Sequence, residues 1–479
     1  MPEPEKTAPW CGFLRHVLYV VFLCEGFAAL VFSIDSISPR VSIKWAGLFA
    51  IILFAAICVG ARFLPERGGT KANSEQNWTA FFWGILCLGV VVRIVWLVSV
   101  PPVQTSDYAR YLTAARNLLD TGTYTEYLRG LRFRAFTPCG WPLVLAAGIR
   151  VLGDRSWTPA ILNLGAYAGA SLLLYRLSAR LAGKRAAVWA TLIIALWPSN
   201  VLMTGLAASE PLFVLFFLAG CFLLFLPDSI SLRCAPLCGI STGFAALTRP
   251  TALTLPVVWL AACLIWGKPL GKRLKAMVLA SLFTALTVAP WTIRNYRVLG
   301  AFVPVSTNGG DVFYRANNPV ATGTWTARGE RDLSQYMGNE VRWNQVGFAW
   351  GKEWIRSHPA KFLKLAVEKQ FVFLGSDETG AYWAVARAYP DKHSLYNMTL
   401  AASDLWWLLI WIAVLFALVR YRMLFLKTPP LLCLLLPVLY FLGIHSIFES
   451  QSRYHIPVVP FLIVVVVLAF IPAYDFRQE

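Results

Sequence analysis

Long apolar runs recur along this 479-residue chain. Each run holds about 15–22 residues with few charges, which is the length that an α-helix needs to cross a hydrocarbon core of about 30 Å. Hydrophobic residues make up 57% of the chain, whereas soluble proteins contain about 45–50%. We therefore predict an all-α polytopic membrane protein and exclude a soluble fold.

The runs predict about twelve transmembrane helices. We expect the first run to be retained as an anchor, because the acidic and polar start MPEPEKTAPW lacks the small-residue cleavage site of a signal peptide. The predicted spans are residues 17–34, 45–61, 79–99, 157–177, 186–202, 210–226, 234–248, 250–266, 276–290, 403–420, 430–446 and 456–473.

The net charge of +18 is explained by membrane orientation rather than by nucleic-acid binding. Lys and Arg gather in short links beside the apolar runs, and links rich in these residues stay in the cytoplasm. With the N-terminus inside, the basic links are residues 62–78, 178–185, 227–233, 267–275 and 421–429. This order places both termini in the cytoplasm.

Two long polar segments, residues 100–156 and 291–402, then fall on the outer face. Loops of this length are functional or disordered, and their aromatic and helical patterns argue against disorder. In the first loop we predict a juxtamembrane helix with Ser106 as its N-cap, and an interfacial or re-entrant helix at 140–153. In the second loop, the pattern of residues 358–374 predicts another amphipathic helix.

These boundaries divide the chain into four regions. They are two N-terminal spans with a cytoplasmic link (1–78), a membrane module that includes the first loop (79–300), the second loop (291–402) and the C-terminal spans (403–479).

Asp107 is the first candidate for chemistry, since it starts the predicted surface helix where water meets lipid. A carboxylate there can act as a base, but Asp in a first helical turn is also a common partner of the helix dipole. Arg110 lies one turn further on, so the two side chains can form a simple surface ion pair. If the reaction were the transfer of a sugar, the Asp107 carboxylate would instead remove a proton from the acceptor hydroxyl, and the Arg110 guanidinium would hold the departing phosphate.

Other polar residues gather on the same outer face. The segment 290–325 combines Arg, Asn, aromatic and paired Gly residues, which suit a polyhydroxylated ligand and equally suit a turn-rich loop. Further ionisable residues lie at the outer ends of predicted spans, where they can face a central cavity or act as interfacial anchors. The ten cysteines show no metal-ligand spacing, so no metal site is predicted.

At these residues the chain resembles the bacterial branch of the GT-C membrane glycosyltransferases, the protein O-mannosyltransferase-like and aminoarabinose-transferase-like proteins of glycosyltransferase family 39. The motifs occur in order along residues 100 to 460. They are D-x-x-R-Y with A-R-N-L-L-x-x-G-x-Y (107–124), T-P-C-G-W-P-L-V-L-A (137–146), S-E-P-L-F (209–213), R-P-T-A-L (249–253), P-W-T-I-R-N-Y (290–296) and R-Y-H-I-P-V-V-P (453–460).

The resemblance implies a GT-C fold, a polyprenyl-phosphate-linked sugar donor, an acceptor hydroxyl on a glycan, lipid or protein at the periplasmic face of a bacterial inner membrane, and inversion at the anomeric carbon. It also implies that Asp107 is the catalytic base and that Arg110 lies near the donor phosphate. The expected substrate-binding residues are Arg110, Tyr111, Arg134, Glu210, Arg249, Arg294, Asn295, Asn308, Asn317, Arg453, Tyr454 and His455.

The chain departs from its relatives in the first loop. Several relatives carry a second acidic residue associated with a metal ion, whereas the stretch LRFRAFTPCG here has Arg132 and Arg134 and no acid. This argues against a divalent metal, and no other cofactor is expected. Two alternatives to single-sugar transfer remain open, a transporter or flippase for a lipid-linked sugar and a ligase or polymerase that joins preassembled glycans. The motifs leave the sugar and the acceptor unspecified.

Overall fold

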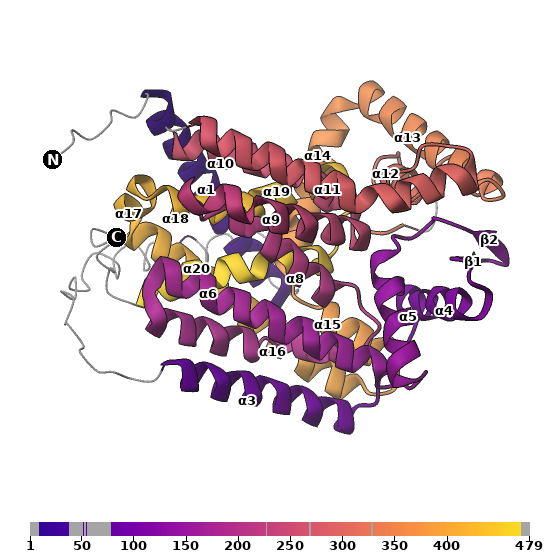
Figure 1. Ribbon diagram of the computed structural model, residues 1–479, viewed down its shortest axis with the longest axis horizontal. Helices are drawn as coiled ribbons and strands as arrows, with labels where there is room; N and C mark the ends of the chain where they lie inside the picture. The colour runs from indigo at the N-terminus through magenta and orange to yellow at the C-terminus, as the bar shows by residue number, and fades with distance from the viewer. Residues whose placement is uncertain are drawn as a thin grey trace.

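The structure, a computed structural model, describes residues 9–37, 51, 54, 78–226, 228–267, 270–326 and 329–470. Nearly all of the predicted span at 45–61 and of the link at 62–78 falls outside this part of the chain. The described residues form a bundle of helices with one small pair of strands, seen in Figure 1. The predicted all-helical membrane architecture is thus confirmed, except for the strand pair.

Six helices of the described chain are long and apolar enough to cross a membrane: Cys11–Ser36, Trp78–Ser99, Thr158–Ala195, Leu270–Leu299, His393–Arg420 and Pro429–Ile447. They correspond to α1 (Pro9–Ile37), α3 (Trp78–Ser99), α6 (Thr158–Ala195), α11 (Leu270–Leu299), α16 (His393–Arg420), and α18 (Pro429–Cys433) with α19 (Leu435–Ile447). The remaining helices of the bundle are α7 (Pro198–Leu202), η1 (Met203–Gly205), α8 (Glu210–Cys221), η2 (Phe222–Leu224), α9 (Asp228–Thr248), η3 (Pro250–Thr254), α10 (Leu255–Trp266), α17 (Arg422–Lys427), η6 (Ser452–Val458) and α20 (Val459–Phe470). Every predicted span within the described residues overlaps a helix.

Helix α6 contains two of the predicted spans, joined by a sharp kink. Gly183 has φ 87° and ψ 164°, a conformation outside the helical region that glycine adopts without steric cost. Tyr167 in the first half of α6 and Ala195 in the second half both lie next to Gly89 of α3, where an added Cβ atom would contact them. The two halves therefore fold back on each other. The predicted separation into spans at 157–177 and 186–202 therefore matches this hairpin.

Helix α20 forms the centre of the bundle. Its residues from Val459 to Leu468 are all buried, and it packs against α6 and α16 near the middle of the bundle in Figure 1. A helix that is apolar all round is found in a protein core or as a membrane span, and the burial of these residues places α20 in the core.

A buried arginine joins α3 to the end of α6. The Arg93 side chain is fully buried, and it donates hydrogen bonds to the carbonyls of Gly89 and Ala195 and to the side chain of Asn200. Its guanidinium also lies 3.6 Å from the centre of the Tyr167 ring. Hydrogen bonds to carbonyls, one of them at the free end of α6, thus stabilise a charge that would otherwise be costly inside a membrane.

The first loop contains α4 (Ser106–Thr121), β1 (Glu126–Leu128), β2 (Leu131–Phe133) and α5 (Gly140–Leu152). The two helices confirm those expected there. The antiparallel strands were not predicted; they are joined by Arg129 and Gly130, both with positive φ, as two-residue hairpin turns require. The prediction of Ser106 as N-cap is wrong, because Thr105 precedes the helix and Ser106 is its first residue.

The second loop contains α12 (Gly309–Arg315), η4 (Leu333–Tyr336), α13 (Glu340–Ser357), α14 (Pro359–Gly375), α15 (Thr379–Ala381) and the π-helical turn η5 (Tyr382–Ala386). Helix α14 confirms the helix expected at 358–374. Helices α12 and α13 cross so closely that a Cβ atom at Gly310 would collide with the backbone of Asn344. In Figure 1, α12 and α13 lie at the same end of the bundle as the first loop, whereas α17 and α18 lie at the other end.

Candidate active site

Asp107 lies between two arginines that come from distant parts of the chain. One carboxylate oxygen, Oδ1, pairs with Arg110 one turn along α4. The other, Oδ2, accepts a hydrogen bond of 3.1 Å from Nη1 of Arg453 in η6. Since about a quarter of the Asp107 and Arg110 side chains is exposed, this group is enclosed by protein and still reachable. The sequence predicted the Asp107–Arg110 pair, but it gave no sign that Arg453 joins it.

The backbone at the start of α4 is strained. Ser106 has φ 52°, in the left-handed region that residues other than glycine rarely adopt. Such strain persists only where the surroundings enforce it, and it concentrates at functional sites. The strained residue stands directly before Asp107.

A second ion pair lies close to the first. Glu210 at the start of α8 is buried and pairs with Arg249, which precedes η3 and also donates to the hydroxyl of Ser209 at 3.3 Å. The charges of Glu210 and Arg249 act on the tyrosines beside Asp107, as do those of Arg453 and Asp107 itself. We refer to the resulting group as the Asp107 cluster, made of Asp107, Tyr108, Arg110, Tyr111, Glu210, Arg249 and Arg453.

Arginine charges control the ionisation of Asp107. Burial by itself would raise the pKa of this carboxyl, but Arg453 and Arg110 outweigh it through charge and hydrogen bonds and lower the pKa to about 2. The carboxylate is therefore charged across the physiological range. Burial and the charge of Asp107 raise the pKa of Tyr111 to about 12, so its hydroxyl stays protonated.

The second loop reaches the same region through α12. Asp311 pairs with Arg315 at 3.0 Å, and Arg315 lies 3.9 Å from the buried Glu449. Glu449 accepts a hydrogen bond of 2.9 Å from the hydroxyl of Tyr454, which neighbours Arg453. Segment 449–454 thus joins the Asp107 cluster to the second loop.

Several of the predicted ligand-binding residues donate hydrogen bonds to backbone carbonyls. Arg294 donates to the carbonyls of Arg134 and Tyr124 at 2.6 and 3.0 Å. Arg134 donates to the carbonyl of Val298 at 3.2 Å, and buried Asn295 donates to the carbonyls of Val303 and Val305. The two arginines thus fasten the end of α11 to the first loop, and Asn295 fastens it to the residues that follow the helix.

The remaining amides and the histidine also lie outside the Asp107 cluster. Asn308 accepts from the hydroxyl of Ser306. Asn317 donates to the carbonyl of Ile447 and accepts from the buried Lys369. His455 is fully buried, with Nδ1 2.9 Å from the carbonyl of Phe373 and Nε2 3.0 Å from Asp377, which also accepts from Trp197. We call Trp197, Asp377 and His455 the His455 cluster.

Two buried carboxylates that were not singled out from the sequence organise the first loop. Glu126 accepts from the backbone nitrogen and the hydroxyl of Thr137. Glu340 accepts from the backbone nitrogens of Arg134 and Ala135 and from the hydroxyl of Thr307. A Glu that begins a helix, as Glu340 does in α13, is a common sequence pattern, so nothing distinguished it beforehand.

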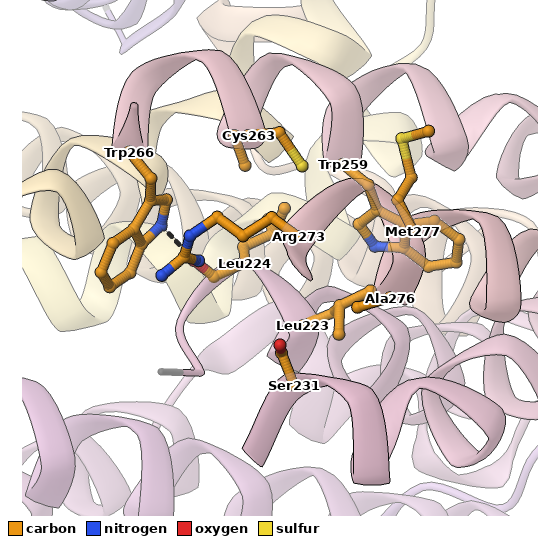
Figure 2. Close-up of a pocket in the computed structure, with 10 residues that line it drawn as sticks. Leu223, Leu224, Ser231, Trp259, Cys263, Trp266, Arg273, Ala276 and Met277 are labelled. Atoms are coloured by element: carbon orange, nitrogen blue, oxygen red, sulfur yellow. Dashed lines mark hydrogen bonds between the residues drawn. The ribbon is translucent and has the colours of Figure 1, made fainter. Parts of the chain in front are cut away.

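Among the described residues, no group of three or more His, Cys, Asp and Glu side chains could hold a metal ion. A separate pocket occurs where α10 meets α11, lined by Trp259, Cys263, Trp266, Arg273 and neighbours (Figure 2). There the Arg273 guanidinium lies 3.7 Å from the centre of the Trp266 ring. Since α11 continues from Met277 to Leu299, roughly 33 Å further toward the second loop, the pocket is remote from Asp107.

Comparison with known proteins identifies the class. Residues 137–293 match the family described as dolichyl-phosphate-mannose-protein mannosyltransferase. No curated protein matches the chain. The oligosaccharyltransferase AglB from Archaeoglobus fulgidus, solved with an inhibitory peptide and a dolichol-phosphate, has a TM-score of 0.50 at 12% identity, over 82% of this chain and 50% of that one.

Two further solved structures are similar. The same archaeal oligosaccharyltransferase tethered to an acceptor peptide has a TM-score of 0.51 at 14% identity, over 83% of this chain and 50% of that one. ArnT from Cupriavidus metallidurans, bound to undecaprenyl phosphate, has a TM-score of 0.43 at 13% identity, over 82% of this chain and 77% of that one. This chain spans about half the length of the oligosaccharyltransferases it matches.

The chain therefore shares its fold with the archaeal oligosaccharyltransferase AglB. Residues 137–293 match the model of the mannosyltransferase family. The resemblance drawn from the ordered motifs is confirmed.

Proposed function

We propose that this protein is a glycosyltransferase of the GT-C class that moves a sugar from a polyprenyl-phosphate-linked donor to an acceptor hydroxyl, with inversion at the anomeric carbon. The family match at residues 137–293 supports the reaction class. The dolichol-phosphate held by the archaeal oligosaccharyltransferase, which shares the fold, supports a lipid-phosphate donor.

The observation that carries the proposal is the position of Asp107 between Arg110 and Arg453. A reaction of this kind needs a base beside the acceptor and positive charge beside the leaving phosphate. The Asp107 cluster offers both within one group that remains partly exposed. Together Asp107 and Glu210 carry two negative charges, and Arg110, Arg249 and Arg453 carry three positive ones, so an anion would be attracted.

Asp107 acts as the general base in this mechanism. It takes the proton of the acceptor hydroxyl while the acceptor oxygen bonds to the anomeric carbon. The bond between that carbon and the phosphate oxygen breaks on the opposite face, and its electron pair leaves with polyprenyl phosphate. Each oxygen of Asp107 is engaged by one arginine and keeps a second lone pair for the acceptor proton. A guanidinium that turns toward the donor phosphate would leave the carboxylate a stronger base.

The orientation in the membrane is part of the proposal. We infer about twelve spans with both termini in the cytoplasm of a bacterial inner membrane, and a site on the outer face. The gathering of the first loop, α12 and α13 at one end of the bundle supports a common side for both loops (Figure 1). The regions 1–78, 79–300, 291–402 and 403–479 keep the roles predicted from the sequence.

Release of free polyprenyl phosphate by purified protein tests the proposal. Supplied with a polyprenyl-phosphate sugar and a cell-envelope extract as the acceptor source, the protein should release one polyprenyl phosphate for each sugar transferred, with inverted configuration in the product. Movement of the donor across a vesicle membrane without release would establish a flippase instead. Transfer of preassembled oligosaccharides alone would establish a ligase.

A further inference from the structure

The hydroxyl of Tyr108 is buried without a partner. The side chain is 1% exposed, and its oxygen makes no hydrogen bond with any described residue. Buried polar groups are paired in the great majority of cases, and an orphaned one carries a large free-energy cost. A cost of this size at the start of α4 calls for an explanation.

The surroundings of this hydroxyl are charged. Asp107 precedes Tyr108 in the chain, and the charges of Glu210, Arg453, Asp107 and Arg249 all act on the hydroxyl. Burial is the main reason that the pKa of Tyr108 is raised well above 10. The group therefore stays protonated and is available as a hydrogen-bond donor.

The ring itself is firmly placed. It packs edge-on against Trp383 of η5, with the ring centres 5.5 Å apart. Aromatic contacts of this geometry fix orientation, so removal of the hydroxyl alone should leave the ring in position.

We propose that Tyr108 is a substrate-binding residue whose hydroxyl donates a hydrogen bond to a phosphate oxygen of the lipid-linked donor. The inference rests on the proposed function, which supplies the phosphate. It assigns a purpose to the unpaired donor, since the three arginines of the Asp107 cluster exceed its two carboxylates by one charge and a phosphate would meet both the charge and the hydroxyl.

Binding of undecaprenyl phosphate to the purified, detergent-solubilised chain tests this assignment. Tyr108→Phe should weaken binding roughly tenfold, the loss expected for one hydrogen bond to a charged group. The melting temperature should stay equal or rise, because no internal hydrogen bond is lost. Binding of undecaprenol, which lacks the phosphate, should be the same for both proteins.

Tyr124→Phe is the matched control in the same loop. Its hydroxyl lies 3.2 Å from the hydroxyl of Thr137, so the variant should melt at a lower temperature and bind undecaprenyl phosphate as the unmodified protein does. Equal affinity of Tyr108→Phe and the unmodified protein would overturn the inference, and so would a loss of stability like that of Tyr124→Phe. Failure of the unmodified protein to bind undecaprenyl phosphate would instead contradict the proposed function, and this inference with it.

Discussion

Two polar clusters share one short segment of the chain. They differ in exposure, in hydrogen bonding and in net charge, which are the properties that decide whether a cluster can bind a ligand. Arg453 and His455 stand two residues apart in η6, where each residue turns the chain by about 120°. Their side chains therefore leave the helix in different directions, Arg453 toward Asp107 and His455 toward Asp377.

The His455 cluster is closed. His455 and Asp377 are completely buried, the imidazole has an acceptor at each nitrogen, and its ring stacks on Trp407 with the centres 4.2 Å apart. The Asp107 cluster is partly exposed and contains an unpaired hydroxyl and a surplus of positive charge. The comparison shows how a structural polar group differs from one prepared for a ligand, and it predicts opposite results of mutation.

Arg453→Gln should have the largest effect on activity. It removes one of the two charges that face Asp107 and the expected phosphate, so release of polyprenyl phosphate should fall about 100-fold. The measurement is the release assay with purified protein. Arg116→Gln in α4, the helix of Asp107, is the control, because the pair of Arg116 with Asp154 is about half exposed and should contribute little. Equal losses in both variants would break the distinction.

His455→Gln should act on stability instead. The change disturbs two buried hydrogen bonds, and we expect it to lower the free energy of unfolding by about 2 kcal/mol. Thermal melting in detergent measures this loss. The protein that remains folded should release polyprenyl phosphate within about threefold of the unmodified rate. A loss of activity without a loss of stability would place His455 in the reaction.

Lys369 provides a smaller, pH-dependent test. Its buried ammonium donates to Asn317 and to the carbonyls of Ser446 and Ile447, and burial lowers its pKa from 10.5 to about 8 despite the nearby charge of Glu449. The unfolded chain therefore binds this proton more tightly, so stability should rise as the pH increases above about 8. We expect a gain of about 1 kcal/mol by pH 9.5 that Lys369→Met lacks. Parallel pH profiles of the two proteins would show that Lys369 is not responsible.

The smallest expected effect concerns Asp107 at mildly acidic pH. Its pKa of about 2 lies below the ordinary 3.8, so the stabilisation from its ion pairs is complete above about pH 4 and is lost as the pH falls toward 2. The difference in melting temperature between the unmodified protein and Asp107→Asn should thus be the same at pH 8 and pH 5. A difference that shrinks by pH 5 would mean that the arginines do not hold the carboxylate in this way.

The helices were predictable because membrane burial leaves a strong local signal. Apolar runs identified α3, α11 and α16, and the basic link after residue 177 anticipated the turn at Gly183. Hydrophobic runs carry no information about the hairpin of Glu126 to Phe133, which depends on Arg129 and Gly130 adopting positive φ.

The site was predictable only in part. Asp107 and Arg110 are one helical turn apart, so their pairing follows from local geometry. The contact of Arg453 with Asp107 joins residues that are 346 positions apart, and no pattern in a single sequence reports it. Composition also could not tell that Arg294 and Asn295 hold backbone carbonyls, because the same side chains suit a sugar ligand. Tyr108 was hidden among apolar positions of an amphipathic helix.

The central claim is that Asp107 serves the reaction and not the fold. The most direct measurement compares polyprenyl phosphate release by Asp107→Asn and by Asp154→Asn, a carboxylate in the same loop that is about half exposed. Asp107→Asn should lose at least about 100-fold in rate, as expected for removal of a general base. Asp154→Asn should keep its activity. Release by Asp107→Asn at half the unmodified rate or more would contradict the account.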